Sequence, residues 1–306
     1  MAARDWAFLL MLSALWGASY PLIKVALEGH VGPFEIVLLR LVIATVVLYL
    51  VARLQGSELP RTARTWRSFA IMGLVGTAAP FFFISWGETR IDASLAAILS
   101  ATVPFFTVFL AHVWIPDERL TVRSIAGIAI GFLGVVVLVG DVRLGGASSA
   151  LPGVISLLLS SLCYGIANIV ARNALREVPP VVASTGQMLM GAVFVAIPGG
   201  ISTLTSTQAP TPQGLLAVAG VALLGTVAAY LIYYRLIARV GSSRTSTVAY
   251  LLPAFAVLYG TFLLKEALTL RLLIGFALIL LGVAVVNGNL RRVRALSAAA
   301  GARLAR

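Results

Sequence analysis

The sequence has few charged residues and almost no cysteine. Of its 306 residues, 11% are charged and 60% are hydrophobic, whereas a soluble domain carries roughly 25% charged residues. A soluble fold of this length lacks the interior to cover that apolar surface, so lipid must cover it. The single cysteine, Cys163, excludes an intramolecular disulfide and a cysteine-based metal site.

Candidate metal ligands and catalytic groups are scarce too. The two histidines, His30 and His112, are far apart and have no second ligand at metal spacing. No nucleophile elbow and no phosphate-binding glycine loop followed by lysine is present. We therefore expect no metal, no cofactor and no catalysis. The net charge of +12 would suit nucleic acid, but the basic residues are dispersed between apolar runs, so nucleic-acid binding is not expected.

Apolar runs bounded by charges, glycine and proline predict ten transmembrane helices. The basic residues concentrate in alternate loops, which places both termini in the cytoplasm. The ten spans together leave no stretch long enough for a soluble domain, so the predicted fold class is an all-α integral membrane protein. The predicted spans cover 6–27, 34–53, 68–88, 92–114, 122–140, 152–172, 181–203, 213–236, 244–264 and 271–289.

The two halves of the chain resemble each other at a shift of 148 or 149 residues. Such a match predicts a duplication, with repeats at 1–147 and 148–290 and a basic cytoplasmic tail at 291–306. Each repeat holds five spans, an odd number, so the second is inverted in the membrane. Inverted repeats are typical of transporters, because each half can adopt the other's conformation. The matches include Gly76 with Gly225, Thr77 with Thr226, Pro104 with Pro253, Glu118 with Glu266, and Trp16 with Tyr164.

Two prolines, Pro104 and Pro253, fall near the middle of spans four and nine. Each removes a helix hydrogen bond, so each could act as a hinge or gate. The alternative is a static kink absorbed by packing. Their matching positions in the repeats favour the hinge.

Deep aromatic residues predict a cavity in the membrane. A tyrosine hydroxyl or a tryptophan N–H in hydrocarbon needs a partner, which favours a cavity over plain packing or an interfacial belt. Neighbours four residues apart share a helix face. The cavity candidates are Trp16, Tyr20, Phe82, Tyr164, Asn168, Tyr230 and Tyr234.

Four polar groups are poorly compatible with lipid: Lys24, Arg40, Asn168 and Gln187. Each costs several kcal/mol unless it faces water or a partner. One interpretation of Arg40 is a structural ion pair with Glu88. The other is that Lys24 or Arg40 attracts a carboxylate or phosphate on a solute, which would place these groups in the substrate cavity.

No acidic residue lies near the predicted bilayer midplane. Proton-driven carriers often use such a buried carboxylate. The sequence therefore favours facilitated movement of a solute down its gradient, or coupling through an acid at the outer end of a helix, such as Glu88.

Three segments are similar to the drug/metabolite transporter superfamily, in its ten-helix EamA branch. They are LWGASYPLIK at 15–24, PFEIVLLRL at 33–41 and KEALTLRLLIGFALILLGV at 265–283. The resemblance implies a basket of spans one to four and six to nine around a central cavity, with spans five and ten at one side, in a monomer or homodimer. It also implies a bacterial inner membrane protein that exports amino acids or other metabolites.

Within that branch the chain most resembles the YddG-type exporters of aromatic amino acids, and Tyr250 would join the deep aromatic residues that stack on such a solute. The superfamily's four-helix members use a glutamate within the first span, where this chain has only Lys24 and, at the outer end, Glu28. Carriers of organic anions or sugar phosphates, with Lys24, Arg40 and Lys265 as the cations, and proton-coupled efflux remain the alternatives.

Overall fold

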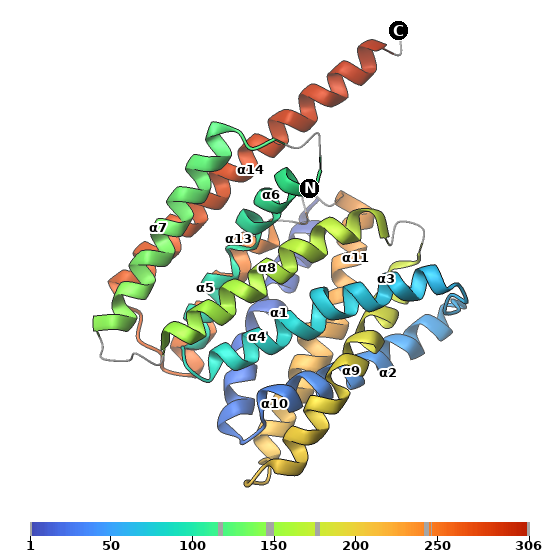
Figure 1. Ribbon diagram of the computed structural model, residues 1–306, viewed down its shortest axis with the longest axis vertical. Helices are drawn as coiled ribbons and strands as arrows, with labels where there is room; N and C mark the ends of the chain where they lie inside the picture. Colours follow the sequence, from blue (N-terminus) through green and yellow to red (C-terminus); the bar gives the residue numbers. More distant parts are fainter. Residues whose placement is uncertain are drawn as a thin grey trace.

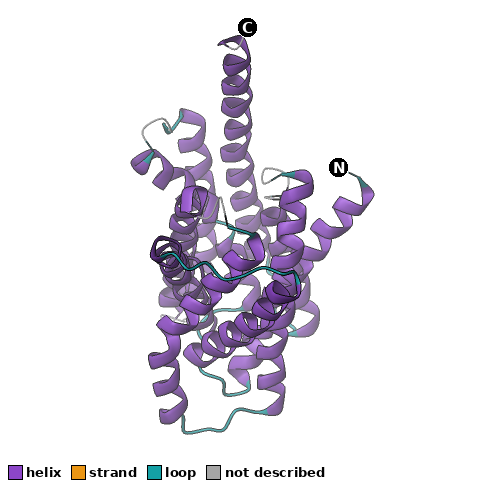
Figure 2. Ribbon diagram, turned by 90° about the vertical axis from the view of Figure 1, so that its right-hand side faces the viewer, coloured by secondary structure: helices purple, strands orange, loops and turns teal. Residues whose placement is uncertain are grey.

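A computed structural model describes residues 2–115, 119–144, 150–174, 178–241, 245 and 247–304. Glu118 and the predicted boundary at 147/148 lie outside these ranges. The described chain is all-helical and supplies the ten predicted spans, of which eight are long apolar helices and two are shorter. The predicted fold class is thus confirmed. Both termini lie in the upper half of the molecule in the two views (Figures 1 and 2).

The first repeat contains spans one to five. Helices α1 (Ala3–Glu28) and α2 (Pro33–Leu54) are single spans. Span three combines α3 (Ala63–Gly73), the π-helical segment η1 (Leu74–Ala78) and α4 (Ala79–Glu88). Span four combines α5 (Ala93–Ser100) and α6 (Val103–Trp114), and span five is α7 (Val122–Leu144).

The second repeat follows the same plan. Helices α8 (Ala150–Ala174) and α9 (Pro180–Thr205) are spans six and seven. Span eight combines α10 (Pro212–Ala222), η2 (Leu223–Ala228) and α11 (Ala229–Val240). Span nine is α13 (Val248–Leu263) and span ten is α14 (Leu270–Leu304), which continues through the predicted tail.

Span four differs from the continuous helix expected over 92–114, because it is interrupted at Ala101 and Thr102. Pro104 falls in the first turn of α6, where its missing N–H leaves no hydrogen bond unmade. Pro253, its counterpart, lies inside the continuous helix α13. The two related prolines therefore occupy different local structures.

The two π-helical segments were not predicted from the sequence. They occupy equivalent positions in the two repeats, and each contains a matched Gly-Thr pair, Gly76–Thr77 or Gly225–Thr226. The Thr77 hydroxyl donates to the Gly73 carbonyl at 2.7 Å, and the Thr226 hydroxyl donates to the Val221 carbonyl at 3.1 Å. Isolated π turns inside helices often mark functional sites.

Helices α7 and α14 pack along each other beside the main bundle, as Figure 1 shows. Glycines make this approach close: a Cβ on Gly127 would lie 2.8 Å from the Gly282 carbonyl oxygen, and one on Gly134 would lie 2.7 Å from that of Gly275. The other spans form the basket. There α2 packs on α9, α1 on α13 and α8 on α6, so contacts between repeats build the interior.

Candidate functional site

A buried arginine lies between the two repeats. Arg40 on α2 is 5% exposed. Its Nε–H donates to the Thr226 hydroxyl in η2 at 2.8 Å, and its guanidinium carbon lies 3.6 Å from the centroid of the Phe81 ring on α4. The ion pair with Glu88 that the sequence allowed is not formed. The described residues thus give the Arg40 guanidinium a hydroxyl and a ring face, but no carboxylate.

Gln187 is the counterpart of Arg40 in the second repeat. Pro33 and Pro180 begin α2 and α9, and Arg40 and Gln187 each lie seven residues further on. A Cβ added to Gly76 in η1 would lie 3.1 Å from the Gln187 amide nitrogen. Each repeat therefore sends a polar side chain from its second span to the π-helical segment of the other repeat.

Aromatic side chains surround these two polar groups. Trp16 contacts Tyr230 edge to face, with centroids 6.4 Å apart, and Tyr233 at 5.4 Å. Tyr230 also contacts Tyr234 at 6.1 Å. Tyr164 packs against two of the buried clusters that join the repeats. Trp16, Tyr20, Arg40, Tyr164, Gln187, Tyr230 and Tyr234, all named from the sequence, thus lie in one interior region.

Three of the predicted cavity residues take other places. Phe82 stacks on Phe34 with ring centroids 4.1 Å apart. The Asn168 amide donates to the Thr107 hydroxyl on α6 at 3.2 Å, and its side chain is exposed. The Tyr250 hydroxyl donates to the Val283 carbonyl at 3.4 Å, which directs it toward α14. Conversely, Phe81 and Tyr233 were not predicted from the sequence. For Tyr233, the spacing of three residues from Tyr230 was the available signal.

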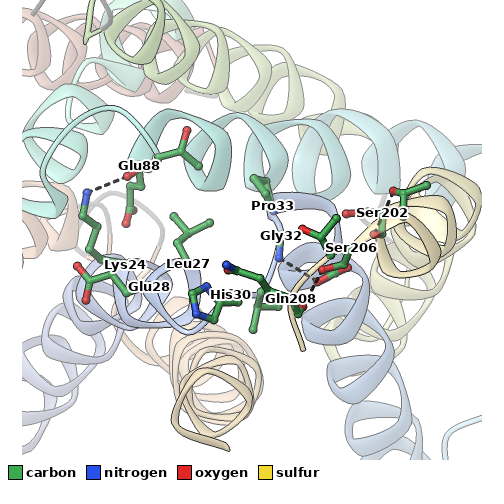
Figure 3. Close-up of a pocket in the computed structure, with 15 residues that line it drawn as sticks. Lys24, Leu27, Glu28, His30, Gly32, Pro33, Glu88, Ser202, Ser206 and Gln208 are labelled. Carbon is green, nitrogen blue, oxygen red and sulfur yellow. Dashed lines mark hydrogen bonds between the residues drawn. The ribbon is translucent and has the colours of Figure 1, made fainter. Parts of the chain in front are cut away.

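A cavity of about 580 Å³, here called the distal cavity, lies at the end of α1 away from the N-terminus. Figure 3 shows the side chains that line it. The Lys24 ammonium donates to the carbonyls of Glu88 at 2.9 Å and Ile91 at 3.1 Å, and so satisfies two backbone acceptors at and just beyond the C-terminal end of α4. The residues that line this cavity are Lys24, Leu27, Glu28, His30, Val31, Gly32, Pro33, Glu35, Glu88, Thr89, Ser202, Thr205, Ser206, Thr207 and Gln208.

Two buried acids of the distal cavity differ in their surroundings. Glu35 is 4% exposed and accepts a hydrogen bond from the Gly32 N–H at 2.9 Å. Glu88 is fully buried, and neither of its carboxylate oxygens has a hydrogen-bond partner in the described part of the chain. A buried carboxylate without partners is costly. Glu88 is therefore the unusual group of this end of the molecule.

The beginning of α5 is held by an acid from the other repeat. The Glu266 carboxylate accepts from the N–H of Ala93 at 2.7 Å, from that of Ser94 at 3.0 Å, and from the Ser94 hydroxyl. Asp92, in the loop before α5, has a raised pKa because burial disfavours its charged form and because the negative charge of Glu266 is near. From the sequence, Glu266 was only the repeat match of Glu118, since nothing local relates it to residues more than 170 positions away.

The proline segments contact glycines of the other repeat. A Cβ on Gly17 would lie 2.9 Å from the Leu252 carbonyl oxygen, beside Pro253. One on Gly165 would lie 3.0 Å from the Phe106 Cβ, near Pro104. Gly17 follows Trp16 and Gly165 follows Tyr164. The aromatic region and the two proline segments are thus neighbours along the same helices.

The model of the EamA-like transporter family matches the chain twice, over residues 5–140 and 151–288. The chain belongs to the EamA-like transporter family. It is therefore a multi-pass membrane transporter and not an enzyme. Membership also explains the paired architecture, because both matched segments carry the same five-span unit.

Several transporters align with most of this chain. An uncharacterized transporter of Archaeoglobus fulgidus is 26% identical over 92% of this chain and 98% of its own length. The uncharacterized inner membrane transporter YedA of Escherichia coli K12 is 30% identical over 85% of this chain and 83% of its own. A probable terminal-alkyne amino-acid exporter of Streptantibioticus cattleyicolor is 28% identical over 92% of both chains.

A solved crystal structure has the same fold. It superposes on 93% of this chain and 98% of its own with a TM-score of 0.63, at 23% sequence identity. At that identity the likeness concerns the fold alone.

Proposed function

We propose that this EamA-like transporter exports amino acids, with a preference for aromatic ones, and related small metabolites across a bacterial inner membrane. Transport occurs by alternating access of the two repeats, with gates around Pro104 and Pro253, and is facilitative. The protein works as a monomer or homodimer with both termini in the cytoplasm.

The observation that carries this proposal is the buried group of Arg40 and the aromatic side chains between the repeats. A guanidinium without a carboxylate partner is a receptor for a carboxylate on a solute. Trp16, Tyr164 and Tyr230 provide ring faces and edges for an apolar or aromatic side chain. An amino acid offers both complementary parts.

Two further observations support an amino-acid solute and facilitated movement. One relative is named as a probable amino-acid exporter, so the family architecture is compatible with that cargo. Among the described spans, the buried acids lie at helix ends, as Glu88 does at the end of α4. A midplane carboxylate of the kind that proton-driven carriers use is not among them.

A second candidate is a carrier of organic anions or sugar phosphates. Arg40, which has no carboxylate partner among the described residues, also supports this second candidate, because a guanidinium binds phosphate as well as carboxylate. Lys24 is less suited to either role in this conformation, because its ammonium already donates to two carbonyls.

Reconstituted liposomes separate these candidates. Uptake and counterflow are measured with labelled tryptophan, phenylalanine, threonine and an organic phosphate, with and without a pH gradient. Saturable amino-acid flux that ignores the gradient is the expected result. Flux of the phosphate alone would replace the proposal by the anion carrier, and gradient-driven flux would replace the facilitative mechanism by coupling.

The aromatic part of the proposal has its own test. Replacement of Trp16, Tyr164 and Tyr230 together by alanine is expected to abolish flux of aromatic amino acids while the protein remains monodisperse in detergent. Unchanged flux in this triple variant would contradict an aromatic cavity.

A further inference from the structure

Two ionisable side chains of opposite type are buried in the first repeat, and neither has an ion-pair partner among the described residues. Arg40 is 5% exposed and contacts Thr226 and Phe81. Glu88 is fully buried, and both its carboxylate oxygens lack hydrogen bonds. Burying an unpaired charge costs several kcal/mol, so each of these groups calls for a partner that the protein does not supply.

The two charges face one region. Phe81, which lies under the Arg40 guanidinium, and Glu88 are seven residues apart on α4, which is two turns on the same face and about 10 Å along the helix axis. The charges of Arg40 and Glu88 act on each other, and both act on the hydroxyl of Tyr20. Tyr20 on α1 therefore lies near both groups.

The other charges around Glu88 do not neutralise it directly. The Lys24 ammonium donates to the backbone carbonyls of Glu88 and Ile91 and not to the carboxylate. Glu266, the remaining charge that acts on Glu88, is itself negative and is committed to the beginning of α5. The Glu88 carboxylate thus remains available to a positive group of a ligand.

We propose that Arg40 and Glu88 together bind the charged headgroup of a zwitterionic α-amino acid, with the solute's carboxylate on Arg40 and its ammonium group on Glu88. This inference rests on the proposed function and names the substrate class more narrowly. One ligand satisfies both orphan charges at once, and its side chain extends toward the rings of Tyr164 and Tyr230. Glu88 also lines the distal cavity.

A proton on Glu88, or an anion on Arg40 alone, would each satisfy only one of the two charges. Solute preference separates the headgroup site from the other two possibilities, and the response to a pH gradient identifies a proton on Glu88. With a headgroup site, a zwitterion binds better than an acid or an amine of the same side chain. With a site at Arg40 alone, the acid binds as well as the zwitterion.

The experiment compares phenylalanine, phenylpropionate, which lacks the ammonium group, and phenethylamine, which lacks the carboxylate. Each competes in proteoliposomes with whichever labelled solute the wild-type protein carries. The wild type is expected to prefer phenylalanine to both analogues by about tenfold or more. Glu88→Gln should remove the preference over phenylpropionate, and Arg40→Gln should remove the preference over phenethylamine.

Glu35→Gln is the matched control, because Glu35 is an equally buried acid of the same cavity whose carboxylate already has a backbone partner. Its solute preferences should equal those of the wild type. Glu88→Asp, which keeps the charge, should retain part of the preference and guards against misfolding of the glutamine variant. Size-exclusion chromatography checks the fold of each variant.

Equal competition by phenylalanine and phenylpropionate in the wild type would overturn the headgroup site. So would a Glu88→Gln variant that keeps the zwitterion preference, or one that changes only the response to a pH gradient, which would assign the proton to Glu88. If the protein carries another solute but phenylalanine still competes through Arg40 and Glu88, the headgroup site stands and the proposed export function fails.

Discussion

The Nε–H of Arg40 donates to the hydroxyl of Thr226 at 2.8 Å, which ties the second span of one repeat to the π-helical segment of the other. Both residues are buried. The same hydroxyl donates to the Val221 carbonyl of its own span. The Thr226 hydroxyl therefore satisfies a backbone acceptor and accepts from a buried guanidinium at the same time.

Thr226→Val is expected to lower both thermal stability and transport. The substitution keeps the shape but removes the acceptor, and leaving a buried charged donor unpaired costs about 1–3 kcal/mol or more. The change is measured as the unfolding temperature in detergent and as counterflow in liposomes. Thr226→Ser should restore both.

Thr77→Val is the matched control for this prediction. Thr77 occupies the equivalent position and is also fully buried, but its hydroxyl is described only as a donor to the Gly73 carbonyl. Thr77→Val should therefore lower thermal stability and transport less than Thr226→Val does. Equal losses in the two variants would mean that the Arg40 contact adds nothing.

Gly17→Ala should destabilise the protein by about 1–3 kcal/mol, because a Cβ there would press on the Leu252 carbonyl and the Phe255 side chain at 2.9 Å. Gly200→Ala on α9 is the control, since nothing lies within 4 Å of its Cβ position and alanine favours helix there. Unfolding temperatures in detergent test the pair. A Gly17 variant as stable as the Gly200 variant would show that α1 and α13 are less tightly packed than described.

Asp92 gives a pH-dependent contribution to stability. Its pKa in the folded protein is raised above 3.8 by burial and by the charge of Glu266. Between the pKa of the unfolded chain and the higher pKa of the folded protein, the folded state therefore binds more protons than the unfolded state. Stability from this group is therefore greatest at low pH and falls as pH rises through that window. Asp92→Asn cannot ionise, so its advantage in unfolding temperature over the wild type should grow with pH. A difference that stays constant with pH would contradict the raised pKa.

The orientation of the chain is tested with a membrane-impermeant thiol reagent. In a Cys163→Ala background, Thr207→Cys lies in the distal cavity and Gln55→Cys lies in an exposed loop at the other end of α2. With the termini in the cytoplasm, spheroplasts should label position 207 and not position 55, and lysis should expose both. The reverse pattern would invert the proposed orientation.

The sequence predicted the ten spans because each depends on a local run of apolar residues. Span two illustrates this: it was expected at 34–53 and is found at Pro33–Leu54. The inward position of Arg40 and Gln187 also followed, since a polar side chain within a span avoids lipid. Their partners did not follow, because the contact of Arg40 with Thr226 joins residues 186 positions apart.

Other features had no local signal. The π-helical segments are formed by ordinary apolar stretches around Gly-Thr pairs, and the repeat match showed only that the two stretches are alike. Tyr250 lies as deep in its span as the other predicted aromatic residues, but depth does not show which face of α13 is turned toward the cavity. The Tyr250 hydroxyl donates to the Val283 carbonyl of α14. The interruption before Pro104 and the continuous helix at Pro253 show that equal residues in two repeats take different local structures when their surroundings differ.

Each π-helical segment is one wide turn within an otherwise regular span, followed by the aromatic residues Phe81 and Phe82 in span three or Tyr230 in span eight. An α-helix advances about 100° per residue. Deleting one residue from either segment would therefore rotate every later side chain of that span by about 100°. A deletion in η1 would move the Phe81 ring away from Arg40. The direction in which these rings point thus depends on the number of residues in each π-helical segment. The two segments should therefore tolerate substitutions far better than insertions or deletions.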